Sequence, residues 1–282
     1  MLVVNGFDRL APPAVIDTDE DAGFDFDADP GVAFHHDIST GGRQTNFSRN
    51  AKESVRGDSG NEWEGLTFGG NTFDYPFVHG QAIMQAGVYS FASTSDEALE
   101  AGYITPEGFA AIDYILGMEK DDPNAHPLFG QRYKTFSPEM QRIFRAYTTT
   151  GGNVFVSGAY VGSDMRSINE MVFTQDVLKY QFAAQHHVIG DVFSAFGMNR
   201  TARVASALNA HCYAVPSADI LNAVGQAFTA MVYTDTNQSA AIAYQGSDYR
   251  SFTLGFPFEA INDPVERNHI MASILRFLVS RE

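Results

Sequence analysis

The chain has 282 residues, of which 44% are hydrophobic and 18% charged, which is enough for one large globular domain with a buried core. Its 34 acidic and 18 basic residues give a formal net charge of −16, which disfavours binding to nucleic acids and to anionic lipids. No apolar run approaches the length of a membrane-spanning helix, so no membrane insertion is expected.

The first predicted element is a buried strand, Leu2–Asn5, which is apolar and ends in an Asn-Gly turn signal. Residues 10–66 have no helical or strand periodicity and are rich in Asp, Gly, Ser and Asn, so we expect a long acidic loop inserted after this strand. A helix is expected over residues 78–86 and a strand over residues 88–92.

Capping signals then predict two short helices. Ser95 is a good N-cap, with Asp96 and Glu97 in the first turn, where acidic side chains favour the helix dipole. The sequence Thr-Pro-Glu at residues 105–107 predicts a second helix start. The apolar run over residues 111–116 predicts a buried strand.

Residues 137–139, Ser-Pro-Glu, predict the start of a third helix, with Ser at the N-cap and Pro at the first helical position. Apolar residues with helical spacing follow, and a Gly-Gly pair at residues 151–152 ends the helix. A strand is expected over residues 154–157 and a further helix over residues 173–182. Residues 186–227 give no clear pattern.

The last part of the chain predicts three strands, over residues 229–233, 240–244 and 251–256. Turn residues separate them, so we expect them to be antiparallel. The sequence Asp-Pro-Val-Glu at residues 263–266 resembles a capping box with Pro at the first helical position, and it predicts a final helix that packs on the sheet.

Alternating strands and helices in the first two thirds predict a single α/β domain over residues 1–282, with a doubly wound, mostly parallel sheet and antiparallel C-terminal strands. Both chain ends lie next to predicted elements, so we expect the domain to be part of a larger protein. Ligands in such sheets bind beyond the carboxyl ends of the strands. The ligand-binding candidates that follow strands are Asn5, Asp8, Arg9, Gly158 and Tyr160.

Four stretches occur in the order LVVNGFDR, GGNTFDYPFVHG, TGGNVFVSGAY and TLGFPFEAI. Together they resemble a domain of large secreted or envelope proteins of Bacteroidetes that are labelled xanthan lyase, golvesin-type or N-acetylmuramoyl-L-alanine amidase. That domain is similar to the class I glutamine amidotransferase-like superfamily, and the resemblance spans most of the chain. The strand and helix pattern differs from the helical toroids of xanthan lyases, so no lyase reaction is inferred.

The resemblance implies an amidotransferase-like or flavodoxin-like fold and a secreted, periplasmic or cell-surface location. It implies a polysaccharide, peptidoglycan or other glycan as ligand, and other domains of the same chain as partners. Asn71, in the motif GGNTFDYPFVHG, is a further ligand-binding candidate.

The catalytic candidates are Asp74, His79 and Ser157. The amidotransferase family has a cysteine nucleophile after a strand, whereas this chain has Ser157, so glutamine amidotransfer is not expected. A serine elbow needs G-x-S-x-G, but Phe155 and Ala159 stand at the glycine positions. Asp74 and His79 could form a general-base pair. The favoured alternatives are a helix cap for Asp74, with His79 at the surface on the first turns of that helix, and a backbone-bonding role for Ser157.

Calcium is the one metal that the sequence indicates, at Asp17, Asp19 and Asp21, whose alternation resembles a calcium loop. An EF-hand would also need Gly and Glu at fixed positions where this chain has alanine, so a solvated acidic loop is the favoured alternative. The single cysteine, Cys212, has no zinc-binding spacing and is expected to be a buried thiol. No other cofactor is expected.

Three functions stay open. The first is a domain that binds or helps process extracellular glycan without catalysis of its own. The second is a hydrolase, an amidase or esterase, that uses Asp74, His79 and Ser157. The third is a structural spacer in a multidomain protein. The missing elbow glycines and the missing nucleophilic cysteine favour the first and the third.

Overall fold

The computed structural model describes most of the chain outside the acidic N-terminal segment. The described residues are 1–7, 14–17, 22–25, 75–87, 89–121, 134–186, 190–194, 200–205, 212, 215 and 217–279.

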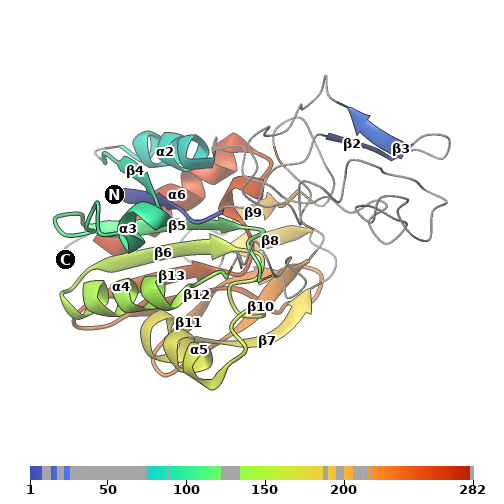
Figure 1. Ribbon diagram of the computed structural model, residues 1–282. Helices are drawn as coiled ribbons and strands as arrows, with labels where there is room; N and C mark the ends of the chain where they lie inside the picture. Colours follow the sequence, from blue (N-terminus) through green and yellow to red (C-terminus); the bar gives the residue numbers. More distant parts are fainter. Residues whose placement is uncertain are drawn as a thin grey trace, which may run out of the picture.

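In this described part, nine strands form one central sheet (Figure 1). Their spatial order is β4 (Ala92–Ser95), β1 (Leu2–Asn5), β5 (Ala111–Gly117), β6 (Asn153–Gly158), β13 (Arg250–Leu254), β12 (Ser239–Gln245), β11 (Phe228–Tyr233), β8 (Asp191–Ser194) and β9 (Arg200–Arg203). The first five are parallel to one another, and the pairings from β13 to β9 are antiparallel.

Strand β1 lies inside the sheet and pairs in parallel with β4 and β5, which confirms the prediction from its apolar sequence. The predicted antiparallel C-terminal strands are confirmed as β11, β12 and β13. Strand β13 also pairs in parallel with β6, so this C-terminal unit belongs to the same sheet.

Helices cover both faces of the sheet (Figure 1). Helices α2 (Tyr75–Gln85) and α6 (Pro264–Val279) pack on one face, and α3 (Asp96–Glu100), α4 (Pro138–Thr149) and α5 (Ile168–Phe173) pack on the other. Alternate residues of a strand point to opposite faces. In β6, Phe155 therefore lies in the core beneath α6, whereas Val154 and Val156 lie in the core beneath α4.

Several predicted element starts are confirmed. The Ser95 hydroxyl accepts a hydrogen bond from the Ala98 N–H at 3.4 Å and caps α3. The Ser137 hydroxyl accepts from the Met140 N–H at 3.0 Å and caps α4. The final helix, α6, starts at Pro264 as expected.

Two predictions between α2 and β5 are wrong. The strand expected over residues 88–92 starts only at Ala92, and it runs directly into α3. The helix expected from residues 105–107 is a single turn. The Phe109 N–H donates to the Pro106 carbonyl at 3.2 Å and closes this turn, and Gly108 within it has a left-handed φ of 87°, which is incompatible with a continuing α-helix.

The helix expected over residues 173–182 is also wrong in its second half. After α5 the chain forms a π-helical turn, η3 (Thr174–Leu178), which ends at Lys179 with a left-handed φ of 64°. Strand β7 (Tyr180–His186) follows and pairs with β10 (Ala218–Ala223) in a separate antiparallel ribbon. Burial of Tyr180 against the core overrides the helical pattern of the sequence.

The acidic segment is not wholly irregular. Strands β2 (Ala14–Asp17) and β3 (Ala22–Asp25) pair as an antiparallel hairpin within the predicted loop of residues 10–66. The rest of that loop lies outside the described residues. None of the described helices is long and apolar enough to cross a membrane.

Candidate functional site

The parallel strands bring two of the predicted site residues into one row at their carboxyl ends. Asn5 lies opposite Ile115 of β5, and Ile115 lies opposite Ser157 of β6. Asn5 is 7% exposed and Ser157 is fully buried. Among the described residues, neither Asn5 Oδ1 nor Ser157 Oγ has a hydrogen-bond partner. A nucleophilic serine needs a base at its hydroxyl, and Ser157 has none in this part of the structure.

His79 lies on helix α2 and is fully buried between two carboxylates from distant parts of the chain, so the surface position expected for it is wrong. Its Nδ1 is 2.9 Å from Asp113 Oδ2, and its Nε2 is 3.3 Å from Glu259 Oε2. The ring of Phe258 packs edge-on against the imidazole, with 4.7 Å between the centroids. Both ring nitrogens are therefore engaged inside the core.

Burial by itself lowers the pKa of His79, but the charge of Asp113 and the hydrogen bonds to Asp113 and Glu259 outweigh it and raise the pKa to about 9. The imidazole is thus protonated at neutral pH. A protonated, buried imidazole with both nitrogens hydrogen-bonded is an ion-pair partner, and it is not available to take a proton from a substrate. Asp74, the partner expected from the sequence, lies outside the described residues.

Of the remaining predicted ligand-binding residues, three lie outside the described part of the chain and two lie at or just after the end of β6. Asp8, Arg9 and Asn71 lie outside the described residues. Gly158 lies where β5 and β6 come close together, and a Cβ there would be 2.7 Å from the Cβ of Leu116. Tyr160 is 7% exposed, and its hydroxyl accepts a hydrogen bond from the Ser217 hydroxyl at 3.3 Å.

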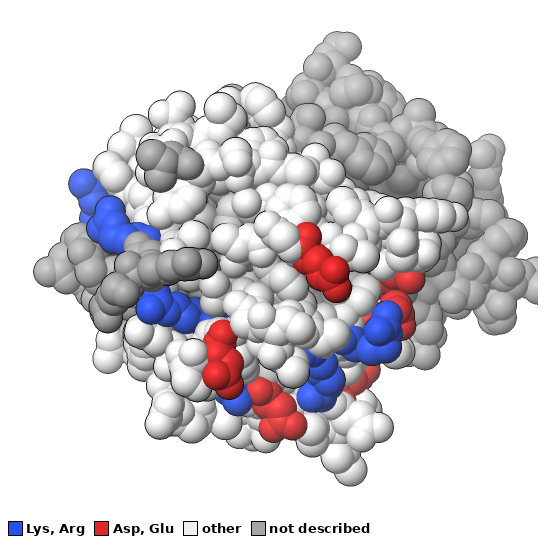
Figure 2. Space-filling model, turned by 90° about the vertical axis from the view of Figure 1, so that its left-hand side faces the viewer, with Lys and Arg blue, Asp and Glu red and all other residues white. Residues whose placement is uncertain are grey.

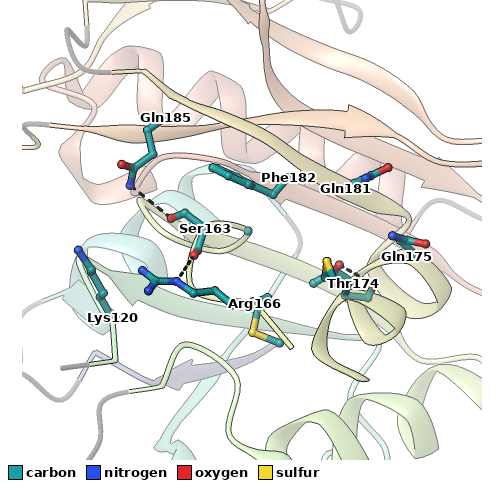
Figure 3. Close-up of a pocket in the computed structure, with 11 residues that line it drawn as sticks. Lys120, Ser163, Arg166, Thr174, Gln175, Gln181, Phe182 and Gln185 are labelled. Atoms are coloured by element: carbon teal, nitrogen blue, oxygen red, sulfur yellow. Dashed lines mark hydrogen bonds between the residues drawn. The ribbon is translucent and has the colours of Figure 1, made fainter. Parts of the chain in front are cut away.

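A pocket of about 490 Å³ lies just beyond these residues, past the carboxyl ends of β5 and β6 (Figure 3). Lys120 enters it from the segment after β5, and Ser163 and Arg166 enter it from the loop after β6. Thr174 and Gln175 come from the π-helical turn η3. Strand β7 contributes Gln181, Phe182 and Gln185.

Hydrogen bonds fix the loop that forms one wall of the pocket. The Arg166 Nε–H donates to the Ser163 carbonyl at 3.0 Å, and the Gln185 amide donates to the Ser163 hydroxyl at 3.4 Å (Figure 3). Behind the loop, the backbone N–H groups of Gly162 and Ser163 both donate to Asp219 Oδ2 at 2.7 Å. Strand β10 therefore holds the pocket wall through one buried carboxylate.

Asp219 is fully buried, and its second oxygen, Oδ1, has no hydrogen-bond partner among the described residues. Burial raises the pKa of this carboxyl group. The hydrogen bonds from the backbone of Ser163 and Gly162 lower it, the negative charge of Asp164 raises it, and the resulting pKa is about 7.

A second hollow, of about 820 Å³, lies at the opposite end of the strands and is lined by turn residues around Gly151 and Ser247. It lies at the amino ends of β6 and β13, where ligands of α/β sheets do not usually bind. Figure 2 shows the face on the left of Figure 1, where strands β6 and β13 begin. Acidic and basic side chains are interspersed on this face. We therefore take the pocket at the carboxyl ends as the candidate site.

The calcium prediction falls mostly on residues that the structure does not describe. Asp17 is the last residue of β2, and Asp19 and Asp21 lie outside the described part. Among the described side chains, no group of three or more His, Cys, Asp or Glu is arranged to hold a metal ion. Cys212 is buried, as expected. Calcium binding by the acidic segment stays a prediction.

The rule applied to the sequence nominates residues at the edge of the sheet where this pocket lies, but it stops before the residues that line the pocket. It nominates Gly158 and Tyr160, whereas Ser163 and Arg166, further along the same loop, line the pocket. Lys120 follows β5 closely enough to have been included by the same rule. The residues of β7 could not be found, because their segment reads as a helix.

Neither known protein families nor curated proteins match the chain. Among solved structures, it is similar to the exo-β-1,4-mannosidase Op5Man5 from Opitutaceae bacterium strain TAV5, at 8% identity and a TM-score of 0.48, over 84% of this chain and 36% of that one. It is similar to Gan42B, a GH42 β-galactosidase, at 10% identity and a TM-score of 0.47, over 75% of this chain and 27% of that one.

A third similar structure is the N-terminal domain of mmIFT52, at 14% identity and a TM-score of 0.46, over 72% of this chain and 89% of that one. The chain thus spans little more than a third of the mannosidase and about a quarter of the galactosidase. At these identities and TM-scores the likenesses carry no argument about function, which must come from the site itself.

Proposed function

We propose that this chain is a domain of a secreted or cell-envelope bacterial protein that binds extracellular polysaccharide or peptidoglycan, and that the pocket between Lys120 and Gln185 is its binding site. The observation that carries the proposal is the composition of this pocket. Gln175, Gln181 and Gln185 each offer amide donors and an acceptor, which suit a hydroxyl-rich ligand. Phe182 is 37% exposed and offers an apolar surface for a sugar ring.

The proposal includes a doubly wound fold of amidotransferase-like or flavodoxin-like type. Its support is the order of the parallel strands, in which β1 lies between β4 and β5 and is followed in space by β6 and β13. This is the strand order of flavodoxin-like sheets, whose ligands bind where the order reverses, next to the first strand. Lys120 follows β5, which is the strand next to the position where the strand order reverses. The resemblance of the four sequence motifs supports the envelope location and a glycan ligand.

Saccharide binding can be tested by calorimetric titration of residues 1–282 with soluble oligosaccharides and peptidoglycan fragments. We expect Phe182→Ala to weaken the affinity about fivefold or more, because an aromatic contact contributes about 1 kcal/mol. Phe77→Ala is the matched control. Phe77 is 61% exposed on α2 and does not line the pocket, so its removal should leave the affinity unchanged. Absence of any saccharide binding, or equal losses in both variants, would contradict the proposal.

The hydrolase alternative rests on Ser157, and the Ser157→Ala variant separates it from the binding proposal. Because the Ser157 hydroxyl is buried without a partner in the described structure, its removal should leave the melting temperature unchanged or raise it. An unsatisfied buried polar group costs about 1–3 kcal/mol. We expect saccharide affinity to be retained. Hydrolysis of a chromogenic ester or amide by the wild type that disappears in Ser157→Ala would establish the hydrolase instead.

A further inference from the structure

Two cations line the candidate pocket without a carboxylate partner in the described structure. Among the described residues, the Arg166 guanidinium makes one hydrogen bond, from Nε to the Ser163 carbonyl, and its terminal nitrogens form no ion pair. Lys120 Nζ lies 5.1 Å from the centre of the Tyr160 ring and likewise makes no ion pair among the described residues. In Figure 3 both side chains lie on the same side of the pocket, with the guanidinium turned toward Lys120.

Not every described cation outside the pocket has a carboxylate partner: Arg145 and Lys179 lie over the rings of Phe173 and Tyr244. The pocket differs because two such cations share one lining, in a chain with 34 acidic and 18 basic residues. Elsewhere on the surface, Arg200 pairs with Glu266 and Arg203 with Asp191. None of the described residues that line the pocket is acidic.

The acidic residues in and next to the pocket loop are already engaged. Asp164, within the loop, accepts hydrogen bonds from the Thr135 N–H and hydroxyl, both at 3.1 Å, and lies 3.5 Å from Lys134 Nζ. Glu170 accepts hydrogen bonds from the backbone N–H groups of Arg166 and Ser167 and pairs with Lys134 at 3.2 Å. Asp219 accepts the two N–H groups behind the loop. None of these carboxylates pairs with Lys120 or with the Arg166 guanidinium, so in the described part of the chain both cations stay available to a ligand.

We propose that the pocket takes a saccharide that carries a carboxylate, such as a uronic acid residue. The inference rests on the proposed function and names its ligand class. The carboxylate would lie between Lys120 and Arg166, since a guanidinium matches the geometry of a carboxylate and an ammonium adds a second charge. The sugar hydroxyls would face the glutamine amides of β7 and η3. A chain of net charge −16 repels anions at a distance, so an anionic ligand needs such a local pair of cations.

The first test uses the wild-type protein and two matched ligands. An oligouronate and its carboxyl-reduced counterpart, which differ only in the carboxylate, are titrated calorimetrically under the same conditions. We expect the oligouronate to bind at least tenfold more tightly. Equal affinities would overturn the inference and leave the proposed saccharide binding intact, whereas no binding of either ligand would contradict the proposed function itself.

The second test places the effect at the two cations. Arg166→Gln and Lys120→Met should each weaken oligouronate binding about tenfold and leave the weaker binding of the reduced ligand unchanged. Arg142→Gln is the matched control, because it removes an exposed charge that pairs with Glu139 on α4 and does not line the pocket. Losses of the same size in this control, or no loss in the pocket variants, would overturn the assignment.

A third ligand identifies what is recognised. A peptide that carries a carboxylate but no sugar, such as a glutamate-containing peptide of bacterial cell walls, should bind at least tenfold more weakly than the oligouronate. If it binds as tightly, the pocket recognises a carboxylate alone, and a saccharide ligand is contradicted.

Discussion

Replacement of His79 by leucine is expected to lower the free energy of unfolding by about 3–5 kcal/mol, the usual cost of removing one partner from a buried ion pair. Asp113 and Glu259 would stay in the core with no positive charge between them, and both are almost completely buried. Urea denaturation at pH 6 measures the loss. A loss below about 1 kcal/mol would show that water reaches the two carboxylates and relieves them.

A double-mutant cycle separates the lost charge from lost packing. In an Asp113→Asn, Glu259→Gln background the two neighbours of His79 are neutral amides, so His79→Leu should cost less than about half as much as in the wild type. An equal cost in both backgrounds would mean that the imidazole contributes by shape alone, through its contact with Phe258.

The same cluster predicts how stability depends on pH. The folded-state pKa of His79 is about 9, above the value of 6.5 for a free imidazole. The stability that this histidine contributes is therefore fully present below about pH 6.5 and is lost as the pH rises toward 9. His79→Leu should remove this loss between pH 6.5 and 9, which a series of denaturation curves would show.

The charge state of His79 also bears on function. A hydrolase that used this residue as general base would need a neutral imidazole near the operating pH. Asp113 and Glu259 hold the imidazole in the protonated state instead, so the cluster favours a role in the core and does not support a hydrolase that uses His79 as its base.

The sequence predicts the parts of the fold that depend on local patterns. The unbroken apolar run of β1 indicates a strand covered on both faces, and Ser95, Ser137 and Pro264 mark helix starts that the structure confirms. The helix predicted at residues 105–107 fails because Gly108 adopts a left-handed conformation, which no sequence pattern reveals, and limits the segment to one turn.

The buried cluster around His79 depends on contacts between distant residues, and local patterns do not show these. His79 is 34 positions from Asp113 and 180 positions from Glu259. The sequence does contain one signal that indicates a buried charged cluster. Asp113 lies inside an apolar strand and Glu259 in the apolar stretch TLGFPFEAI, and a carboxylate at such a position needs a buried partner.

The pocket was beyond prediction for a different reason. Its far wall exists because η3 ends at Lys179 in a left-handed conformation and the chain returns as β7, which places Gln181 and Phe182 opposite the loop after β6. The same residues read as a continuous helix in the sequence. A departure from local preference thus coincides with the proposed binding site, as often occurs with π-helical turns.

Replacement of Asp219 by asparagine is expected to make the protein progressively more stable than the wild type as the pH rises from about 4 to about 7. The folded-state pKa of Asp219 is about 7, against 3.8 for an ordinary aspartate. Between these values the folded protein holds a proton that the unfolded chain has released, so the wild type loses stability as the pH rises, and above pH 7 the loss is complete. Its full size is on the order of 4 kcal/mol, at about 1.36 kcal/mol per pH unit between the two pKa values.

Asparagine has no charge to bury, and its carbonyl oxygen can still accept the Gly162 and Ser163 N–H groups. The difference in unfolding free energy between variant and wild type should therefore grow from pH 4 to 7 and then stay constant. Asp248→Asn, an exposed change at the amino ends of the strands, controls for net charge and should give no such growth.

Asp219→Ala separates the charge of this residue from its role in the pocket wall. Alanine removes the acceptor for both N–H groups, so the loop that carries Ser163 and Arg166 loses the contact that positions it. Saccharide affinity should fall about tenfold or more in Asp219→Ala, because one lost hydrogen bond to a charged group costs about 1.5–3 kcal/mol, and it should stay near the wild-type value in Asp219→Asn. Equal affinities in all three proteins would show that the pocket wall does not depend on Asp219, and a difference in stability that is flat with pH would contradict the raised pKa of this carboxyl group.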